Sequence, residues 1–277
     1  MCKDRHWQAA ACMVLACIML AWGAALALMD GIVWPEATGD VVNSSDKLVI
    51  DQSHADQGYV MVHGPSTNKR LKLRVEKSGT KGYLDYDLNG EQQWEIIPLQ
   101  LGDGNYKFSL YVQASGNKYA SGGQLTVQAA FNDANAAFLV PSQYVYYDPE
   151  TPAVAKSDEL CAGLTTDQEK FDAIREYIKE NYTYDYNKAK TVTGGTLPSV
   201  DYIWDSGMGI CQDLAALAAC MLRVQGIPTR FEIGYVGGNY YHAWTSVDID
   251  GQFVQYDPTA DVSNIPLNSS YRLERYY

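Results

Sequence analysis

Three residues that together could carry out nucleophilic catalysis occur in order in the second half of the chain, namely Cys211, His242 and Asp257. Cys211 opens an apolar helical run that stops at Gly226 and Pro228, so we expect its thiol at a helix N-terminus. A thiol at the positive end of a helix dipole generally has a lowered pKa. The pattern predicts a cysteine nucleophile in a Cys-His-Asp triad.

A predicted hairpin brings the other two triad residues together. The Asp-Gly pair at 250–251 stands between alternating segments and predicts a two-residue turn. This turn would pair Trp244 with Asp257 and place His242 diagonally opposite that carboxylate, at a backbone distance of roughly 7 to 8 Å. We expect Asp257 to orient the imidazole of His242 and to stabilise its cation, while the imidazole exchanges a proton with the thiol.

Four sequence blocks resemble the catalytic core of the transglutaminase-like superfamily: GICQDLAALAACMLR, GIPTRFEIGYV, YHAWTSV and YDPT. They follow the order of the family and cover about residues 165–260. The resemblance implies papain-like thiol chemistry on amides, with a helix bearing the cysteine packed on an antiparallel sheet that bears His and Asp. Members include cross-linking transglutaminases, peptidases, deglycosylating amidases and proteins that retain only a binding role. All three triad positions are intact here.

Simpler interpretations exist for each triad residue taken alone. A buried structural thiol is the commoner state of a single cysteine, although the glycine-flanked helix start of Cys211 argues against it. His242 could be a satisfied strand histidine, and Asp257 before Pro258 could be a turn former. The ordered spacing of all three favours the triad.

An oxyanion hole would need hydrogen-bond donors beside the thiol, and the backbone N–H of Cys211 is the natural first one. The resemblance implies an upstream aromatic side chain as a second donor, but Thr196 falls near that position. The remaining candidates for the oxyanion or substrate site are Gln212, Tyr202, Trp204 and Trp244. For the aromatic side chains at 202 and 204, packing under the catalytic loop is the plainer explanation.

The segment before the thiol contains two further features. Tyr182, Tyr184 and Tyr186 alternate, which suits a strand, an aromatic rim beside the cleft, or core packing. The glycine-rich residues 191–199 that follow predict a mobile loop near the thiol.

The composition indicates a globular protein, and the N-terminal residues indicate export. The 277 residues are 47% hydrophobic and carry a formal net charge of -12, without a basic run, so we expect no nucleic-acid partner. Lys3 and Arg5 precede the apolar residues 9–29, and an A-x-A cue at 25–27 suggests cleavage. This segment is also about long enough to span a membrane. We therefore expect a secreted or cell-surface protein that contacts the membrane only through residues 9–29, if these are retained.

The fold class is predicted as α+β with two domains. Residues 49–147 form short alternating segments typical of an Ig-like β-sandwich, and Thr166 with Glu169 forms a capping-box signal for a helix. We expect a signal peptide or anchor at 1–29, linkers at 30–48 and 148–160, a β-sandwich domain at 49–147, and a transglutaminase-like catalytic domain at 161–277.

No cofactor, metal site or disulfide is expected. The segment 85–90 matches the start of a calcium loop, but the final acid is missing at Ile96, so Asn89-Gly90 is interpreted as a hairpin turn. After the leader, Cys161, Cys211 and Cys220 remain, and we expect them unpaired.

Two classes of function follow from these residues. In the first, an extracytoplasmic thiol enzyme attacks a glutamine carboxamide or a peptide amide, forms a thioester, and transfers the acyl group to water or to a primary amine such as lysine. In the alternative, the chain is a non-catalytic surface binding or adhesion protein that retains the fold. A third, weaker possibility is a covalent anchor between Cys211 and a host amine.

Overall fold

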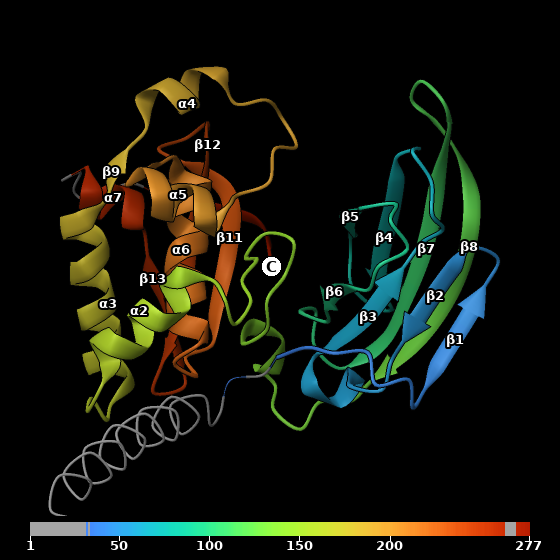
Figure 1. Ribbon diagram of the computed structural model, residues 1–277, viewed down its shortest axis with the longest axis horizontal. Helices are drawn as coiled ribbons and strands as arrows, with labels where there is room; N and C mark the ends of the chain where they lie inside the picture. The colour runs from blue at the N-terminus through green and yellow to red at the C-terminus, as the bar shows by residue number, and fades with distance from the viewer. Residues whose placement is uncertain (1–31, 33, 264–269) are drawn as a thin grey trace, which may run out of the picture. The chain divides into compact units, whose positions relative to one another are not determined.

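The computed structural model describes residues 32, 34–263 and 270–277 (Figure 1). The predicted leader, residues 1–29, lies outside the described residues, so its cleavage stays a prediction. Residues 33–277 form one compact unit. None of the helices in the described ranges combines the length and the hydropathy needed to cross a membrane.

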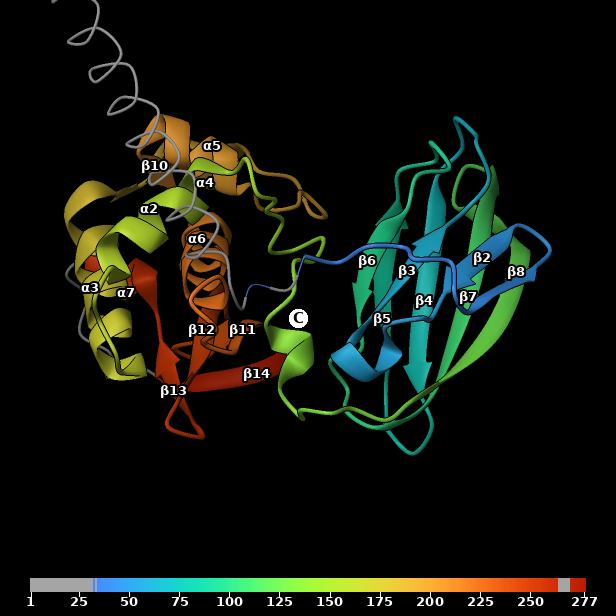
Figure 2. The same cartoon turned by 60° about the horizontal axis from the view of Figure 1, so that its bottom comes forward.

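The N-terminal half of this unit consists of two four-stranded antiparallel sheets (Figures 1 and 2). The first sheet has the order β1 (Val42–Ser45), β2 (Leu48–Asp51), β3 (Tyr59–His63) and β6 (Glu95–Pro98). The second has the order β5 (Leu84–Leu88), β4 (Leu71–Lys77), β7 (Gly104–Ser115) and β8 (Lys118–Ala129). Two short 3₁₀ turns, η1 (Ala55–Gln57) and η2 (Ala136–Phe138), accompany them.

The predicted alternation of buried and exposed side chains is present in these strands. In β4, Leu71, Leu73 and Val75 are buried, and the residues between them are not. They face a buried row on the partner strand β7, which includes Phe108 and Leu110. Each strand therefore buries one face, as period-2 patterning requires. The assignment of this region as an Ig-like sandwich stays a prediction.

Three sequence-based expectations for the connections differ from the structure. Strand β1 and the start of β2 fall within residues 30–48, expected as a linker, and helix α2 (Pro152–Cys161) occupies most of 148–160. Pro152 takes the first helical position, where its missing N–H costs nothing. The prediction of a hairpin at Asn89-Gly90 is wrong, because the strands on either side, β5 and β6, belong to different sheets. Strand β5 pairs with β4, which precedes it, whereas β6 pairs with the more distant β3, which the local turn signal could not reveal.

The C-terminal half is a mixed layer of helices on an antiparallel sheet, which confirms the predicted α+β class. Its sheet has the order β13 (Gln252–Tyr256), β12 (Tyr240–Ile249), β11 (Thr229–Val236) and β14 (Tyr271–Tyr276). The helices after α2 are α3 (Asp167–Asn181), α4 (Tyr186–Thr191), α5 (Val200–Ser206), α6 (Cys211–Arg223) and α7 (Pro258–Val262). A two-residue strand β9 (Thr183–Tyr184) pairs in parallel with β10 (Met208–Gly209).

Helix α6 is the centre of this layer. It packs on β11 and β12 on one side and on α2, α3 and α5 on the other. Every side chain from Asp213 to Arg223 is buried, as expected for a helix covered all round. Helix α3 begins with the predicted capping box, in which the Thr166 hydroxyl accepts from the Glu169 N–H and the Glu169 carboxylate accepts from the Thr166 N–H.

The end of α6 is fixed by a buried guanidinium. Arg223 donates to the carbonyls of Thr229 (2.9 and 2.8 Å), Val140 (2.6 Å) and Tyr277 (3.0 Å). Burial lowers the pKa of Arg223 to about 10. One side chain thus joins α6, β11, the C-terminal residue and the segment that follows the N-terminal sheets.

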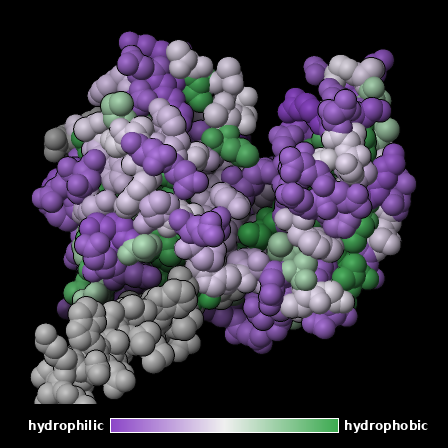
Figure 3. Space-filling view, in the orientation of Figure 1, coloured by the Kyte–Doolittle hydropathy of each residue, from purple (hydrophilic) through white to green (hydrophobic). Residues whose placement is uncertain are grey.

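Most of the surface visible in Figure 3 is hydrophilic, and its hydrophobic side chains form small separate patches. Such scattered apolar residues are ordinary for a protein surface.

Candidate active site

Cys211 is the first residue of α6, as the sequence predicts. The helix start is held by Asp213, a fully buried carboxylate that accepts from the N–H of Ile210 (3.0 Å) and pairs with Lys188 Nζ (2.8 Å). Gly209 is needed just before this turn, since a Cβ there would lie 2.6 Å from Ile203 Cδ1 and 2.9 Å from Asp213 Cβ. The thiol is therefore presented from a rigid helix terminus whose first N–H groups have no intrahelical acceptor.

The predicted two-residue hairpin is confirmed. Ile249 pairs with Gln252 and Thr245 with Tyr256, and the turn residues Asp250 and Gly251 have φ of 52° and 81°. These left-handed values are typical of the type I′ turn that Asp-Gly favours. Asp257 follows directly after β13 and caps the N-terminus of α7.

The carboxylate of Asp257 is almost completely enclosed and hydrogen bonded at both oxygens. Its Oδ2 lies 2.7 Å from His242 Nε2 and accepts from the hydroxyl of Tyr271 at 2.7 Å. Its Oδ1 accepts from the backbone N–H groups of Thr259 (3.0 Å) and Ala260 (3.4 Å). Asp257 is thus both a helix cap and the partner that fixes the imidazole.

His242 contacts both other members of the predicted triad. Burial alone would lower the pKa of His242, but the hydrogen bonds to Asp257 and Cys211 and the charges of both partners outweigh it, and its pKa rises to about 9. Burial raises and the bond with His242 lowers the pKa of Asp257, which ends below its usual range. Since Nε2 faces the carboxylate, Nδ1 is the nitrogen left for the thiol. The imidazole is therefore a cation at neutral pH.

Two of the other candidate residues, Gln212 and Thr196, are hydrogen bonded to each other. The side-chain amide of Gln212 donates from Nε2 to the carbonyl of Thr196 at 3.0 Å. This bond ties the loop 191–199 to the residue next to Cys211. The Thr196 carbonyl is an acceptor, so this contact provides no hydrogen-bond donor for an oxyanion hole.

The three aromatic candidates have other partners. The hydroxyl of Tyr202 donates to Asp185 at 3.0 Å, and Trp204 packs against a ring of α3. Trp244 is buried, donates from Nε1 to Glu232 at 2.6 Å, and stacks on the ring of His242 with centroids 6.2 Å apart. Trp244 therefore packs against the imidazole of His242, whereas the Tyr202 hydroxyl is bonded to Asp185 and the Trp204 indole packs on α3.

Two tyrosines near the triad were not among the predicted site candidates, although Tyr184 was expected in a strand, an aromatic rim beside the cleft, or the core. Tyr184 pairs with Gly209, two residues before Cys211, and burial, followed by the charge of Cys211, raises the pKa of Tyr184 to about 12. The alternating tyrosines at 182–186 were the available signal. Tyr271 carries no local signal, because it reaches Asp257 only through the pairing of β14 with β11. Gly234 permits that pairing, since a Cβ there would lie 2.1 Å from the Arg272 carbonyl oxygen.

The thiols in the described ranges differ in accessibility. Cys161 and Cys220 are buried and free, and burial raises the pKa of Cys161 to about 11 and that of Cys220 as well. Cys211 is also free and is partly exposed. Within residues 34–263 and 270–277, no group of three His, Cys, Asp or Glu side chains is arranged to hold a metal ion.

Comparisons with known proteins point to one family. Residues 154–258 match the family model of the transglutaminase-like superfamily. The uncharacterized protein YebA of Bacillus subtilis (strain 168) is 21% identical over an alignment of 242 positions that covers 73% of this chain. The chain spans only 32% of the length of that relative.

Two solved structures are also similar. A proposed cysteine protease from Cytophaga hutchinsonii is 14% identical, with a TM-score of 0.40, over 79% of this chain and 91% of the other. The periplasmic domain of TgpA from Pseudomonas aeruginosa is 15% identical, with a TM-score of 0.37, over 80% of this chain and 98% of the other. The assignment of residues 154–258 to the transglutaminase-like superfamily rests on their match to the family model.

Proposed function

Since residues 154–258 of this chain belong to the transglutaminase-like superfamily, we propose that the protein is a thiol enzyme that acts on protein or peptide amides through Cys211, His242 and Asp257. One observation carries the proposal. A partly exposed thiol at a helix start meets an imidazole that is held by a buried, fully hydrogen-bonded carboxylate.

In the proposed reaction, His242 keeps the proton of Cys211 and leaves a thiolate that attacks the amide carbon. The tetrahedral intermediate collapses to a thioester when the imidazolium returns its proton to the leaving nitrogen, which departs as ammonia or an amine. Asp257 holds the ring and stabilises its cation throughout. The Asp257 geometry supports this role, because its hydrogen bonds prevent rotation of the carboxylate.

The negative charge on the intermediate requires donors beside the thiol. The N–H of Cys211 at the helix start is one such donor, and the hydroxyl of Tyr184, which pairs with Gly209 just before Cys211, is our candidate for the second. Tyr184 suits this role better than the candidates at 202 and 244, whose polar atoms are bonded to carboxylates.

Water or a primary amine then resolves the thioester, giving hydrolysis or transamidation. The substrate is proposed to be a protein or peptide that presents a glutamine carboxamide or a peptide amide. Action outside the cytoplasm follows from the leader expected at residues 1–29.

The test is trapping of the thioester. The protein is mixed with a glutamine-containing peptide and a biotinylated primary amine, quenched in acid, and analysed by peptide mass spectrometry. We expect an acyl adduct on the Cys211 peptide and amine-labelled or deamidated product. Both should vanish in Cys211→Ala and persist in Cys161→Ala, which removes a buried thiol. Unchanged product formation in Cys211→Ala would refute the enzyme, and binding without turnover in the unaltered protein would favour the adhesion alternative.

A further inference from the structure

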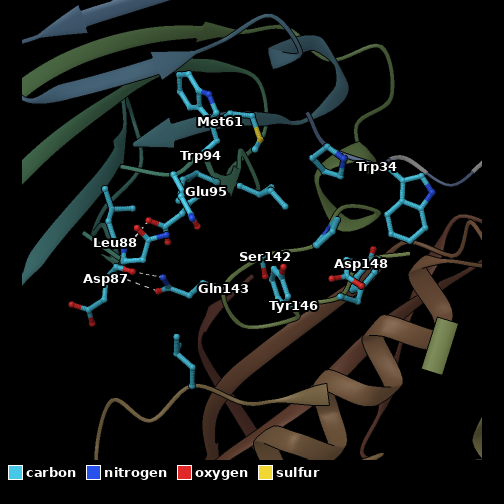
Figure 4. A pocket seen from close by; sticks show the side chains of 18 of the residues that line it. Trp34, Met61, Asp87, Leu88, Trp94, Glu95, Ser142, Gln143, Tyr146 and Asp148 are labelled. Atoms are coloured by element: carbon cyan, nitrogen blue, oxygen red, sulfur yellow. Dashed lines mark hydrogen bonds between the residues drawn. The ribbon is translucent and has the colours of Figure 1, made fainter. Parts of the chain in front are cut away.

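A large cavity lies outside the triad, between the N-terminal strands and the segment 140–149. Its volume is about 830 Å³, within the range typical of sites for small ligands or a few residues of an extended peptide. Figure 4 shows Trp94 and Glu95 on the side of β6, and Tyr146 and Asp148 on the facing segment. Neither the triad nor its supporting tyrosines line it.

The walls of this cavity present aromatic rings to solvent. Trp94 and Tyr146 are 38% and 57% exposed, although large aromatic side chains are usually covered. Trp34 lines the same space, and the ring of Trp94 is held edge-on against His63 at a centroid distance of 4.5 Å. Rigid, half-open rings of this kind provide contact area at a low cost in conformational entropy.

The charge in the cavity has one sign. Its lining includes the acidic residues Asp87, Glu95 and Asp148, and none of the described residues that line it is Lys, Arg or His. The Asp148 carboxylate accepts from the Glu150 N–H at 2.8 Å and from the Thr151 hydroxyl at 3.3 Å. Asp87 is already paired with Lys72 Nζ at 2.9 Å. Within the described residues, the Glu95 carboxylate has no ion-pair partner, and it accepts one hydrogen bond, from the Asn89 N–H at 2.9 Å.

The environment of Glu95 is costly for its charge. Burial, and then the nearby charge of Glu91, raises the pKa of Glu95 to about 7, despite the hydrogen bond from Asn89. A cation placed in the cavity would favour the ionised carboxylate and offset this cost. The site is therefore complementary to a positively charged group.

The cavity also has features that suit an extended chain. Strand β6, which supplies Glu95, Ile96 and Ile97, is the last strand of its sheet, so its outer edge has no paired strand among the described residues. Extended peptides commonly bind along such edges. The neighbouring edge of β5 is instead covered by Gln143. Its side-chain oxygen accepts from the Asp87 N–H, and its side-chain nitrogen donates to the Asp87 carbonyl.

The cavity is connected to the thiol through the loop 191–199. Leu197 and Pro198 line it, and the adjoining Thr196 carbonyl accepts from Gln212, next to Cys211. The same loop thus contributes to the cavity and bonds to the residue next to Cys211.

We propose that this cavity binds an extended peptide segment of the substrate that carries an arginine or lysine, with the basic side chain paired to Glu95 and its neighbours packed on Trp94 and Tyr146. The site accounts for recognition at a distance from the scissile amide. That the bound segment belongs to a substrate rests on the proposed function; the binding itself does not.

The experiment measures binding without turnover, in full-length Cys211→Ala protein by fluorescence anisotropy. The probe is a labelled nine-residue peptide with one arginine between valines and prolines, and its matched control carries norleucine in place of arginine. Glu95→Gln removes the charge of the site. Glu91→Gln removes one charge from the same exposed segment but does not line the cavity.

We expect the arginine peptide to bind at least about tenfold more tightly than the norleucine peptide, and Glu95→Gln to abolish this difference while Glu91→Gln preserves it. Equal binding of both peptides, or equal loss in both variants, would overturn the proposal. So would N-acetylarginine amide binding as tightly as the peptide, because the aromatic walls would then contribute nothing. An arginine preference that depends on Glu95 supports the site even if the unaltered protein turns over no amide, in which case only the proposed function fails.

Discussion

At the scale of single residues, the orientation and charge of His242 depend on the hydrogen bonds that hold Asp257. Its two oxygens accept hydrogen bonds from a histidine nitrogen, a tyrosine hydroxyl and two backbone N–H groups. The carboxylate therefore stays ionised and fixed, and it keeps His242 protonated to a pH of about 9. Because this folded pKa lies above the unfolded value of about 6.5, the pair stabilises the fold fully below that pH and loses the contribution as the pH rises through about 9.

Tyr271→Phe tests the support of the carboxylate. Losing a hydrogen bond to a charged group costs about 1.5 to 3 kcal/mol, so we expect kcat/KM to fall about tenfold or more. The acid limb of the pH profile should move to higher pH, because Asp257 would protonate more readily without this donor. Tyr276→Phe on the same strand is the control and should leave the profile in place. An unmoved acid limb in Tyr271→Phe would assign the hydroxyl a purely structural role.

At the scale of elements, the site depends on how close β14 lies to β11. Gly234 lies on β11, opposite His242 on β12. The register of β11 against β14 shifts between Ile233 and Gly234. Trp244 also packs there, since a Cβ on Gly234 would lie 2.9 Å from its ring. The position of Tyr271 over Asp257 thus follows from a missing side chain on a neighbouring strand.

Gly234→Ala should therefore affect both stability and chemistry. Overpacking at this position typically costs about 1 to 3 kcal/mol, and displacement of β14 would withdraw Tyr271 from Asp257. We expect a lower urea midpoint together with slower alkylation of Cys211. Gly194→Ala is the control, because a Cβ there meets nothing within 4 Å. Full reactivity in Gly234→Ala would show that the site does not need this packing.

The sequence was informative where structure is local. The Asp250-Gly251 hairpin, the capping box of α3 and the helix start at Cys211 are set by neighbouring residues, and the structure has all three. The sequence was misleading at Asn89-Gly90 and silent about Tyr271, because both depend on which distant strands pair. No local pattern indicated the burial of Glu95, because it arises from tertiary packing.

At the scale of the whole unit, Arg223 joins segments that are far apart in the chain. Its guanidinium binds carbonyls at positions 140, 229 and 277 from the end of the helix that begins with the nucleophile. Within the described residues it has no carboxylate partner, so its charge is balanced only by these carbonyl dipoles.

Arg223→Met should lower the free energy of unfolding by about 3 kcal/mol, because buried carbonyls would lose their donor. Urea denaturation followed by tryptophan fluorescence measures this change. Arg70→Met removes an exposed arginine and should alter the unfolding free energy by less than about 0.5 kcal/mol. Equal stability of the two variants would mean that the guanidinium is not needed to join these segments.

The central claim is that Cys211 is an activated thiolate, and the rate of its alkylation by iodoacetamide against pH tests this most directly. Peptide mass spectrometry follows Cys161 and Cys220 in the same sample as buried references. We predict fast modification of Cys211 well below the ordinary thiol pKa of about 8.5, and loss of this reactivity in His242→Ala. Modification that is slow, that follows an ordinary thiol titration, and that is unchanged in His242→Ala would contradict the account.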